Sequence, residues 1–379
     1  MRNRICVIGC LLVLFCILLA GCGERVISVP EKQPENVEHI GQVSAEFADI
    51  VENNLFYGIT AFEDRLLKTE ICSRDEENHT MEHRVWMMDL YGKELASYTC
   101  TADDAYHVTT LTATDDGGFL FVLGFSDRYR DGQWASEKGV ASRVIKCDSD
   151  GNVQFDTPFV DVEGYGLRYC FEGDGKYYFF GEVETPETKT LGVSSRSDIY
   201  MAILDRDGKL LKTNLIAGSD FDDLDHAEMA ADGFVLSIRA QSDDGDFAGS
   251  NSGGYGVNWV FTVDDELQII QREKRTGRDY SDYRIGEKDG KPVHKSDPLF
   301  DGFDAGSVQA FIDYGDFYLI VSENSTGVYE NTPPMISSIW YYTETVYSAY
   351  DNSGKLIFRT AVDSSPDYDS IASKYGGGN

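Results

Sequence analysis

The chain has 379 residues, 42% of them hydrophobic and 12% aromatic, and its formal net charge is −32. This hydrophobic content is typical of a folded protein and excludes a disordered one. A surface this acidic repels phosphate groups, which excludes nucleic acid as a partner and leaves cations, basic proteins and neutral glycans.

The N-terminus has the pattern of an export signal. Arg2 and Arg4 precede the apolar run Ile5–Ala20, which is shorter than an ordinary membrane-spanning helix. The run leads into the letters LAGC, in which the cysteine is Cys22. This order of residues resembles the signal peptide of bacterial lipoproteins, which is cut before a cysteine that then receives lipid. An uncleaved N-terminal anchor and an unlipidated secretory signal are the alternatives.

The resemblance implies a lipid-anchored protein on the extracytoplasmic face of the cell membrane. Residues 1–21 would be the signal peptide, and a diacylated Cys22 would hold the protein on the membrane. Residues 22–38 are polar and contain proline, which suits a tether. Residues 39–362 then form the folded domain, and residues 363–379, which end in GGGN, form a flexible tail.

Two tight-turn motifs recur along the folded domain. In the first, an aspartate ends an apolar strand and a glycine follows three residues later, which suits a type I turn because the carboxylate accepts from the turn backbone. Its complete copies begin at Asp89, Asp148, Asp205 and Asp351. The copy at Asp264 lacks the glycine, so a different hairpin is expected there. The second motif is a glycine turn at Gly117, Gly175, Gly233 and Gly315.

Each repeat is expected to contain four strands. In the second repeat they are His107–Thr114, Phe119–Phe125, Val140–Cys147 and Val153–Phe159. The second strand of a repeat is nearly all apolar, so both of its faces must be buried. Four-stranded units buried on both faces are the blades of a β-propeller. The predicted fold is therefore all-β: a single β-propeller of five four-stranded blades. A β-sandwich, the main rival, would expose alternate residues.

The repeats also resemble a known type. TATDDGGFLFVLGF followed by SRVIKCDSDGNVQFD is similar to β-propeller repeats of bacterial lipoproteins with a DGG[FY] strand and a DxDGN turn. The resemblance implies the architecture and no activity. The expected blades are residues 53–100, 106–159, 165–216, 225–274 and 307–362, with an insertion at 275–306. Six blades are the alternative, with Tyr283–His294 as a further hairpin. In the five-blade scheme, His39–Asp49 supplies a strand that closes or covers the ring.

The connections between strands predict where a partner would bind. With strands lettered a to d from the centre outward, the a–b and c–d turns are tight and lie on one face, the tight-turn face. The b–c and d–a connections are longer and lie on the other face, the long-loop face, where function is expected. The b–c connections are expected at residues 74–83, 126–139, 184–198, 241–256 and 322–344.

Aromatic residues in these connections would suit a protein or glycan partner. The candidates are Tyr129, Trp134, Tyr255, Tyr329 and Trp340. The alternative for Trp340 is that Trp340–Tyr342 begins a strand and packs in the core.

Acidic residues gather where the chain enters each first strand, at the mouth of the channel. The candidates are Asp104, Glu163, Asp223, Asp225 and Asp304. Converging carboxylates there would bind a cation or hydrolyse a glycoside. Because the whole chain is acidic, chance also explains them, and no catalytic residue is assigned.

No cofactor and no metal site is predicted. The turns at Asp148 and Asp205 lack the twelfth-position glutamate of a calcium loop, although a structural cation such as calcium remains an alternative. His79 and His83 do not form an HExxH motif. Cys72, Cys100, Cys147 and Cys170 lack CxxC spacing and are either free thiols or disulfides.

These observations favour a membrane-anchored extracytoplasmic propeller that binds a protein or glycan through its long-loop face. A carbohydrate-active enzyme that uses the channel-mouth carboxylates and a structural subunit of an envelope assembly are the alternatives.

Overall fold

The computed structural model of the chain describes residues 41–103, 106–125, 129–130, 133–134, 142–158, 163–184, 197–230, 232–249, 256–275, 284–289, 291–300, 308–332 and 336–363. Cys22, the tether and residues 364–379 of the tail lie outside these residues, whereas Asp363 ends the last strand. Within the described part of the chain, no helix is long and apolar enough to cross a membrane.

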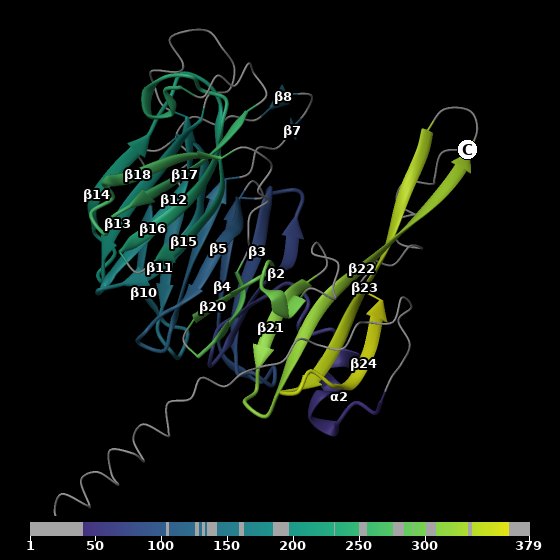
Figure 1. Cartoon of the computed structure of the whole chain (residues 1–379). Helices are drawn as coiled ribbons and strands as arrows, with labels where there is room; N and C mark the ends of the chain where they lie inside the picture. The colour runs from purple at the N-terminus through teal and green to yellow at the C-terminus, as the bar shows by residue number, and fades with distance from the viewer. Residues whose placement is uncertain are drawn as a thin grey trace, which may run out of the picture.

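The strands form a five-bladed β-propeller, which confirms the predicted fold (Figure 1). Each blade contains four strands in antiparallel order. Blade one has β1 (Ile59–Ala61), β2 (Leu66–Asp75), β3 (Thr80–Met88) and β4 (Glu94–Asp103). Blade two has β5 (Tyr106–Ala113), β6 (Phe119–Phe125), β9 (Arg143–Cys147) and β10 (Val153–Pro158), and the short pair β7 (Tyr129–Arg130) and β8 (Gln133–Trp134) lies between β6 and β9 in the sequence. Blade three has β11 (Glu163–Gly173), β12 (Lys176–Glu184), β13 (Asp198–Asp205) and β14 (Leu210–Ile216).

The last two blades carry the additions to the repeat. Blade four has β15 (Asp222–Ala230), β16 (Gly233–Ala240), β17 (Val257–Val263) and β18 (Ile269–Arg275), with the short 3-10 helix η1 (Gly245–Phe247) between β16 and β17. Blade five has β21 (Val308–Asp313), β22 (Phe317–Thr332), β23 (Ile336–Asp351) and β24 (Leu356–Asp363). The insertion before it contains β19 (Arg284–Lys288), β20 (Lys291–His294) and the 3-10 helix η2 (Pro298–Phe300).

The β19–β20 hairpin extends the sheet of blade five to six strands. β19 pairs in parallel with β21 through Gly286 and Phe311. A Cβ atom at Gly286 would lie 2.2 Å from the carbonyl oxygen of Phe311, so this close pairing requires glycine. The hairpin at 283–294 anticipated from the sequence therefore exists, and it belongs to blade five instead of forming a sixth blade.

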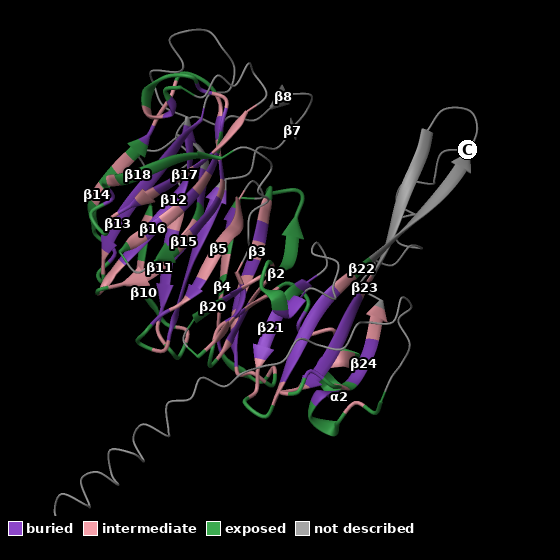
Figure 2. Cartoon of the chain, viewed as in Figure 1, coloured by how far each residue is buried: buried purple, intermediate pink, exposed green. Residues whose placement is uncertain are grey.

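The hydrophobic core lies between neighbouring blades. Buried side chains form one cluster each between blades one and two, two and three, three and four, and five and one. The second strands of blades two, three and five are buried on both faces along their apolar runs, residues 119–124, 177–183 and 318–322, as predicted, and Figure 2 shows this burial in β22. In the other two blades the prediction is wrong, because β2 is exposed from Glu70 onward and β16 alternates between buried residues and residues that are half-buried or exposed. A fifth cluster joins blade five to the insertion through Ile285, Val293 and Phe300. The insertion thus covers the face of blade five that is turned away from blade one.

The aspartate turns have the same structure in all five blades. The backbone N–H of Asp148 donates to Asn152 O, and Asp148 Oδ1 accepts from the N–H groups of Asp150 and Asn152. Equivalent bonds form at Asp264, so the expectation of a different hairpin there is wrong. Leu267 adopts the positive φ, 58°, that glycine adopts in the other copies. Its side chain is fully buried in the cluster between blades three and four, and this burial explains leucine at a position that favours glycine.

The chain before blade one closes the ring with a helix. The sequence predicted a strand within residues 39–49, but the structure has helix α2 (Ala45–Glu52). Phe47 and Ile50, one helical turn apart, enter the cluster between blades five and one. Asn54, just after the helix, donates to Thr345 Oγ1 and accepts from the hydroxyl of Tyr347. The first and last blades are therefore joined by side chains of this segment.

The connections between second and third strands differ from the predicted loops in two blades. In blade one, β2 and β3 continue across most of the expected loop and leave only residues 76–79 between them. In blade five, β22 and β23 pair from Phe317 with Asp351 to Thr332 with Ile336. Most of the expected loop at 322–344 is therefore a long hairpin, visible in Figure 1.

All four cysteines of the described residues are free thiols. Burial raises the pKa of Cys100 to about 11 and of Cys147 to about 12. These two thiols therefore stay protonated and unreactive at neutral pH.

Candidate functional site

The structure places four of the five predicted partner-binding aromatics in two separate hairpins. Tyr129 and Trp134 lie opposite each other in the β7–β8 hairpin. Tyr329 and Trp340 lie in β22 and β23, where Tyr329 pairs with Ile339 and Trp340 pairs with Val328. Tyr255 lies outside the described residues, and the side chains of the other four lie outside the described part of the structure.

Two of the predicted channel-mouth acids come together. Asp223 and Asp225 lie near the start of β15, and both contact the guanidinium of Arg239. Nη2 of Arg239 is 2.5 Å from Asp223 Oδ2 and 3.8 Å from Asp225 Oδ1. Glu163 is the first residue of β11, where its backbone pairs with Glu184. Asp104 and Asp304 lie outside the described residues.

A buried glutamate completes this acidic cluster. Glu182, on β12, is 1% exposed, and its carboxylate lies 2.9 Å from Nη2 of Arg168 and accepts from the backbone N–H of Leu224. Burial raises its pKa to about 7, with Asp223 and Asp225 adding to the effect and Arg168 opposing it. Glu182 can therefore hold or release a proton near neutral pH.

A second buried carboxyl, Asp222, fixes the entry to blade four. It is fully buried, accepts from the Ser242 hydroxyl at 2.8 Å, and also accepts from the backbone N–H groups of Gln241 and Ser242. Burial raises the pKa of Asp222 to about 7, although these hydrogen bonds act to lower it. These bonds join two connections of the long-loop face, the one before β15 and the one after β16.

The first strands surround a central cavity of about 180 Å³. Its lining includes Phe62, Thr110, Tyr169, His226 and Arg284. The Arg284 guanidinium lies 4.8 Å from the centre of the Phe62 ring and 3.3 Å from a Glu287 oxygen, and burial lowers its pKa. The β19 strand of the insertion therefore forms part of the channel wall and adds a cation to it.

Three side chains with metal-binding atoms meet beside this cavity. They are His226 and Glu228 on β15 and His294 at the end of β20. One ligand atom from each lies within 4.8 Å of the others. Nε2 of His226 is 3.7 Å, and Nε2 of His294 is 3.5 Å, from Oε2 of Glu228. Two imidazoles and one carboxylate constitute a donor set for a transition-metal ion.

The histidines considered in the sequence do not form such a group among the described residues. His83 is 2% exposed on β3, and its ring meets that of His107 edge to face at 6.3 Å. Burial is the main cause that lowers the pKa of both imidazoles. His79 lies in the turn before β3 with a positive φ of 53°.

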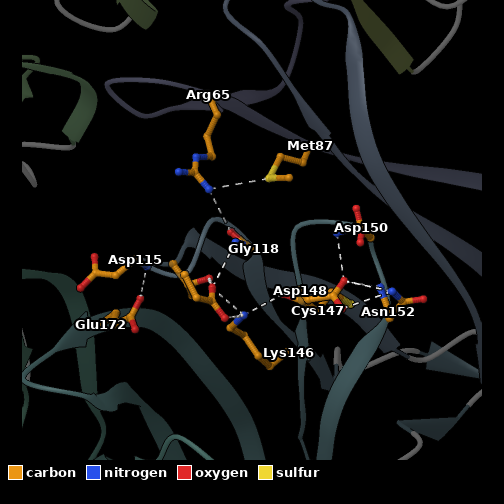
Figure 3. A network of polar contacts seen from close by, with 12 residues as sticks. Arg65, Met87, Asp115, Gly118, Lys146, Cys147, Asp148, Asp150, Asn152 and Glu172 are labelled. Carbon is orange, nitrogen blue, oxygen red and sulfur yellow. Dashed lines mark hydrogen bonds and ion pairs between the residues drawn. The ribbon is translucent and has the colours of Figure 1, made fainter.

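The tight-turn face carries a structural ion pair, shown in Figure 3. Lys146 is fully buried, and its Nζ donates to both oxygens of Asp116 at 3.0 and 2.9 Å and to the carbonyl of Cys147. Burial would raise the pKa of Asp116, but hydrogen bonds from Lys146, Thr114 and the Gly118 N–H lower it to about 2. This network ties the two turns of blade two together.

Sequence reasoning missed Glu182, Arg168 and Arg239 as well as the histidine–glutamate group. The only local signal was His226-x-Glu228, two residues that share one side of a strand. His294 belongs to a segment without a counterpart in the other repeats, so nothing in the sequence placed it near β15.

Comparison with known proteins yields only structural likenesses. No protein-family model and no curated protein matches the chain. A variant of the Synechocystis apocarotenoid oxygenase is 9% identical with a TM-score of 0.34, over 79% of this chain and 58% of that chain. The α-L-arabinofuranosidase from Lactobacillus brevis is 14% identical with a TM-score of 0.33, over 74% and 87%. The chain thus spans 58% of the length of the oxygenase, and these likenesses assign it no activity.

Proposed function

We propose that the chain is a lipid-anchored extracytoplasmic β-propeller that binds a protein partner, with the β22–β23 hairpin as its main contact. The observation that supports this is the extent of strand pairing in blade five. β22 pairs with β21 only as far as Ser322, and β23 pairs with β24 only from Glu344 onward. Beyond these points, as far as Thr332 and Ile336, β22 and β23 pair only with each other among the described strands.

This distal part of the hairpin, residues 323–332 and 336–344, is called the arm. An isolated two-stranded hairpin is marginally stable in water, and each free strand edge is a template for another chain. A partner strand paired to the arm would stabilise the hairpin and cover a free edge. A protein can supply such a strand and a glycan cannot, which favours a protein partner. The arm sequence also contains Tyr329 and Trp340, the residue types that contribute most to binding energy.

Site-specific photocrosslinking tests the arm in its cellular setting. A photoreactive phenylalanine that replaces Tyr329 or Trp340 is expected to capture one defined protein in cells. The same photoreactive amino acid in place of Asp150, on the tight-turn face, should capture none. Replacement of residues 325–343 by a two-residue turn should abolish copurification of that protein. Absence of an adduct at both arm positions overturns the proposal, and binding on a glycan array lost with the arm would replace the protein by a glycan.

The proposed membrane anchor rests on the sequence before the described residues. The basic, apolar and LAGC segments that end at Cys22 support lipidation there. Cys22→Ser is expected to block processing and lipid labelling, so that no mature protein is found in the membrane. A Cys72→Ser variant, which changes an exposed thiol of blade one, should be processed normally. Lipid labelling that persists in Cys22→Ser contradicts the anchor.

One observation favours a carbohydrate-active enzyme as the second candidate. Glu182, with its pKa of about 7, lies in one cluster with Asp223 and Asp225, and glycoside hydrolysis requires one protonated and one ionised carboxyl. A panel of chromogenic glycosides tests this candidate. Hydrolysis that is lost in both Glu182→Gln and Asp223→Asn would support it, and no hydrolysis by the folded protein, or hydrolysis that either variant retains, would exclude it.

A further inference from the structure

We propose that His226, Glu228 and His294 bind a divalent first-row transition-metal ion that joins blade four to the insertion. The site is independent of the arm and of the membrane anchor. Its donor set, the spacing of its atoms and its position between two parts of the ring point to a bound ion.

The spacing of the donor atoms fits a metal site better than a set of hydrogen bonds. The two imidazole nitrogens lie 3.7 and 3.5 Å from Oε2 of Glu228, beyond the roughly 2.9 Å of a good N–H···O bond. Zinc–nitrogen and zinc–oxygen bonds of about 2.0–2.2 Å in a tetrahedron place ligand atoms about 3.3 Å apart. The two nitrogens therefore need to move only a few tenths of an ångström toward Glu228, and the largest separation within the group, up to 4.8 Å, needs a further rotation of the side chains to let them share one ion.

A β-bulge on β15 directs two of the ligands to one side. The register shifts between Leu224 and His226, so Asp225 is an extra residue. Because of this shift, Leu224 and Ala227 both pack into the cluster shared with blade three although they are three residues apart. His226 and Glu228 then point away from that cluster, toward β20. The Tyr169 ring meets His226 edge to face at 5.7 Å and limits its rotation.

The position of the site gives the ion a structural purpose. The other neighbouring blades share apolar clusters directly, whereas the cluster on this side of blade five consists of blade five and the insertion. His226 and Glu228 belong to blade four and His294 to the insertion, so an ion bound by all three would cross-link the two. Such a link adds its binding free energy to the stability of the folded ring.

The donor set selects the class of ion. Imidazole suits zinc, nickel, cobalt and iron, whereas calcium and magnesium prefer oxygen ligands alone. The net charge of −32 favours cations in general. The positive charge of Arg284, which pairs with His294 along the β19–β20 hairpin, is engaged by Glu287 and by the Phe62 ring. Three protein ligands leave a fourth position for water or another donor.

Cobalt titration tests the site directly. The full chain, purified in detergent without a histidine tag and with Cys72→Ser to remove the exposed thiol, is stripped of metal and titrated with Co²⁺. We expect one Co²⁺ per chain, the visible absorption of a four-coordinate ion, and a rise in the midpoint of thermal unfolding. His226→Gln and His294→Gln should each weaken binding by more than the roughly 10–100-fold that loss of a ligand's hydrogen-bond partner costs.

Two controls make the result decisive. His79→Gln, in the turn before β3, should bind Co²⁺ as the parent does, and excess Ca²⁺ or Mg²⁺ should leave the Co²⁺ spectrum unchanged. The metal-free His226→Gln and His294→Gln proteins should keep the thermal midpoint of the metal-free parent. Equal Co²⁺ binding by the parent and both ligand variants, no binding by the parent, or displacement by Ca²⁺ would each overturn the proposal.

Discussion

At the residue scale, the buried ammonium of Lys146 is neutralised by a single counter-ion, the carboxylate of Asp116. The ammonium is fully buried, whereas the Asp116 side chain is 41% exposed. Asp116→Asn keeps the shape but leaves the ammonium without a negative partner. Breaking a fully enclosed pair costs about 3–5 kcal/mol, and because water reaches Asp116 we expect a loss of about 2–3 kcal/mol in the free energy of unfolding at pH 7. Urea denaturation measures it.

The same pair has a defined pH dependence. Because the pKa of Asp116 is lowered to about 2, its contribution is complete above the unfolded pKa near 3.8 and is lost as the pH falls toward 2. The difference between the parent and Asp116→Asn should therefore shrink across that interval. Asp150→Asn, an exposed change in the neighbouring turn, should stay within about 0.5 kcal/mol of the parent at every pH. A loss for Asp116→Asn no larger than this control contradicts the role of the pair.

The pH dependence of stability that Glu182 contributes has the opposite sign. Its folded pKa of about 7 lies above the ordinary glutamate value of 4.5, so the folded state binds the proton more tightly and stability falls as the pH rises between these values. The shift corresponds to about 3 kcal/mol. Glu182→Gln removes this dependence, so its free energy of unfolding relative to the parent should rise by about 3 kcal/mol from pH 4.5 to 7. Glu273→Gln, exposed on β18, should show no such change, and an equally flat difference for Glu182→Gln would contradict the shift.

At the scale of the element, the β17–β18 hairpin shows how packing can override turn chemistry. Leu267 adopts a positive φ, which costs a non-glycine residue about 1–2 kcal/mol. Its burial in the cluster between blades three and four is worth more, because removal of a buried leucine side chain costs about 2–5 kcal/mol. Leu267→Gly should therefore destabilise the protein by about 2 kcal/mol despite the relief of strain.

Calorimetry or urea denaturation checks this balance. Asp265→Ala, an exposed change in the same turn, should have an effect below about 0.5 kcal/mol. Stabilisation by Leu267→Gly would show that strain outweighs burial at this turn.

At the scale of the whole molecule, the sequence predicted what is local and repeated. The turns at Asp148 and Gly117 and the apolar second strands depend on neighbouring residues, and together they identified five blades. The features that the sequence could not predict depend on contacts between segments that are distant along the chain. His294 reaches β15 only because the insertion folds against blade five. The helix at 45–52 was missed because its apolar face, Phe47 and Ile50, packs between the first and last blades, and the local sequence does not show that these blades meet there.

That helix leads to a prediction about closure of the ring. Phe47 is 2% exposed and lies among the rings of Tyr314, Phe317 and Phe358, with centroid distances of 5.3, 5.7 and 5.8 Å. Phe47→Ala leaves a cavity between blades five and one and should lower the free energy of unfolding by about 3–5 kcal/mol.

Because the sheets of a propeller support one another around the ring, the opening of this seam should also increase hydrogen exchange in the strands on both sides, β2 of blade one and β24 of blade five. Glu46→Ala changes the exposed neighbour on the same helix and should leave both the stability and the exchange near the parent values. A cost below about 1 kcal/mol for Phe47→Ala, or faster exchange confined to the helix, would mean that contacts such as Tyr314 Oη donating to Leu90 O close the ring without the helix.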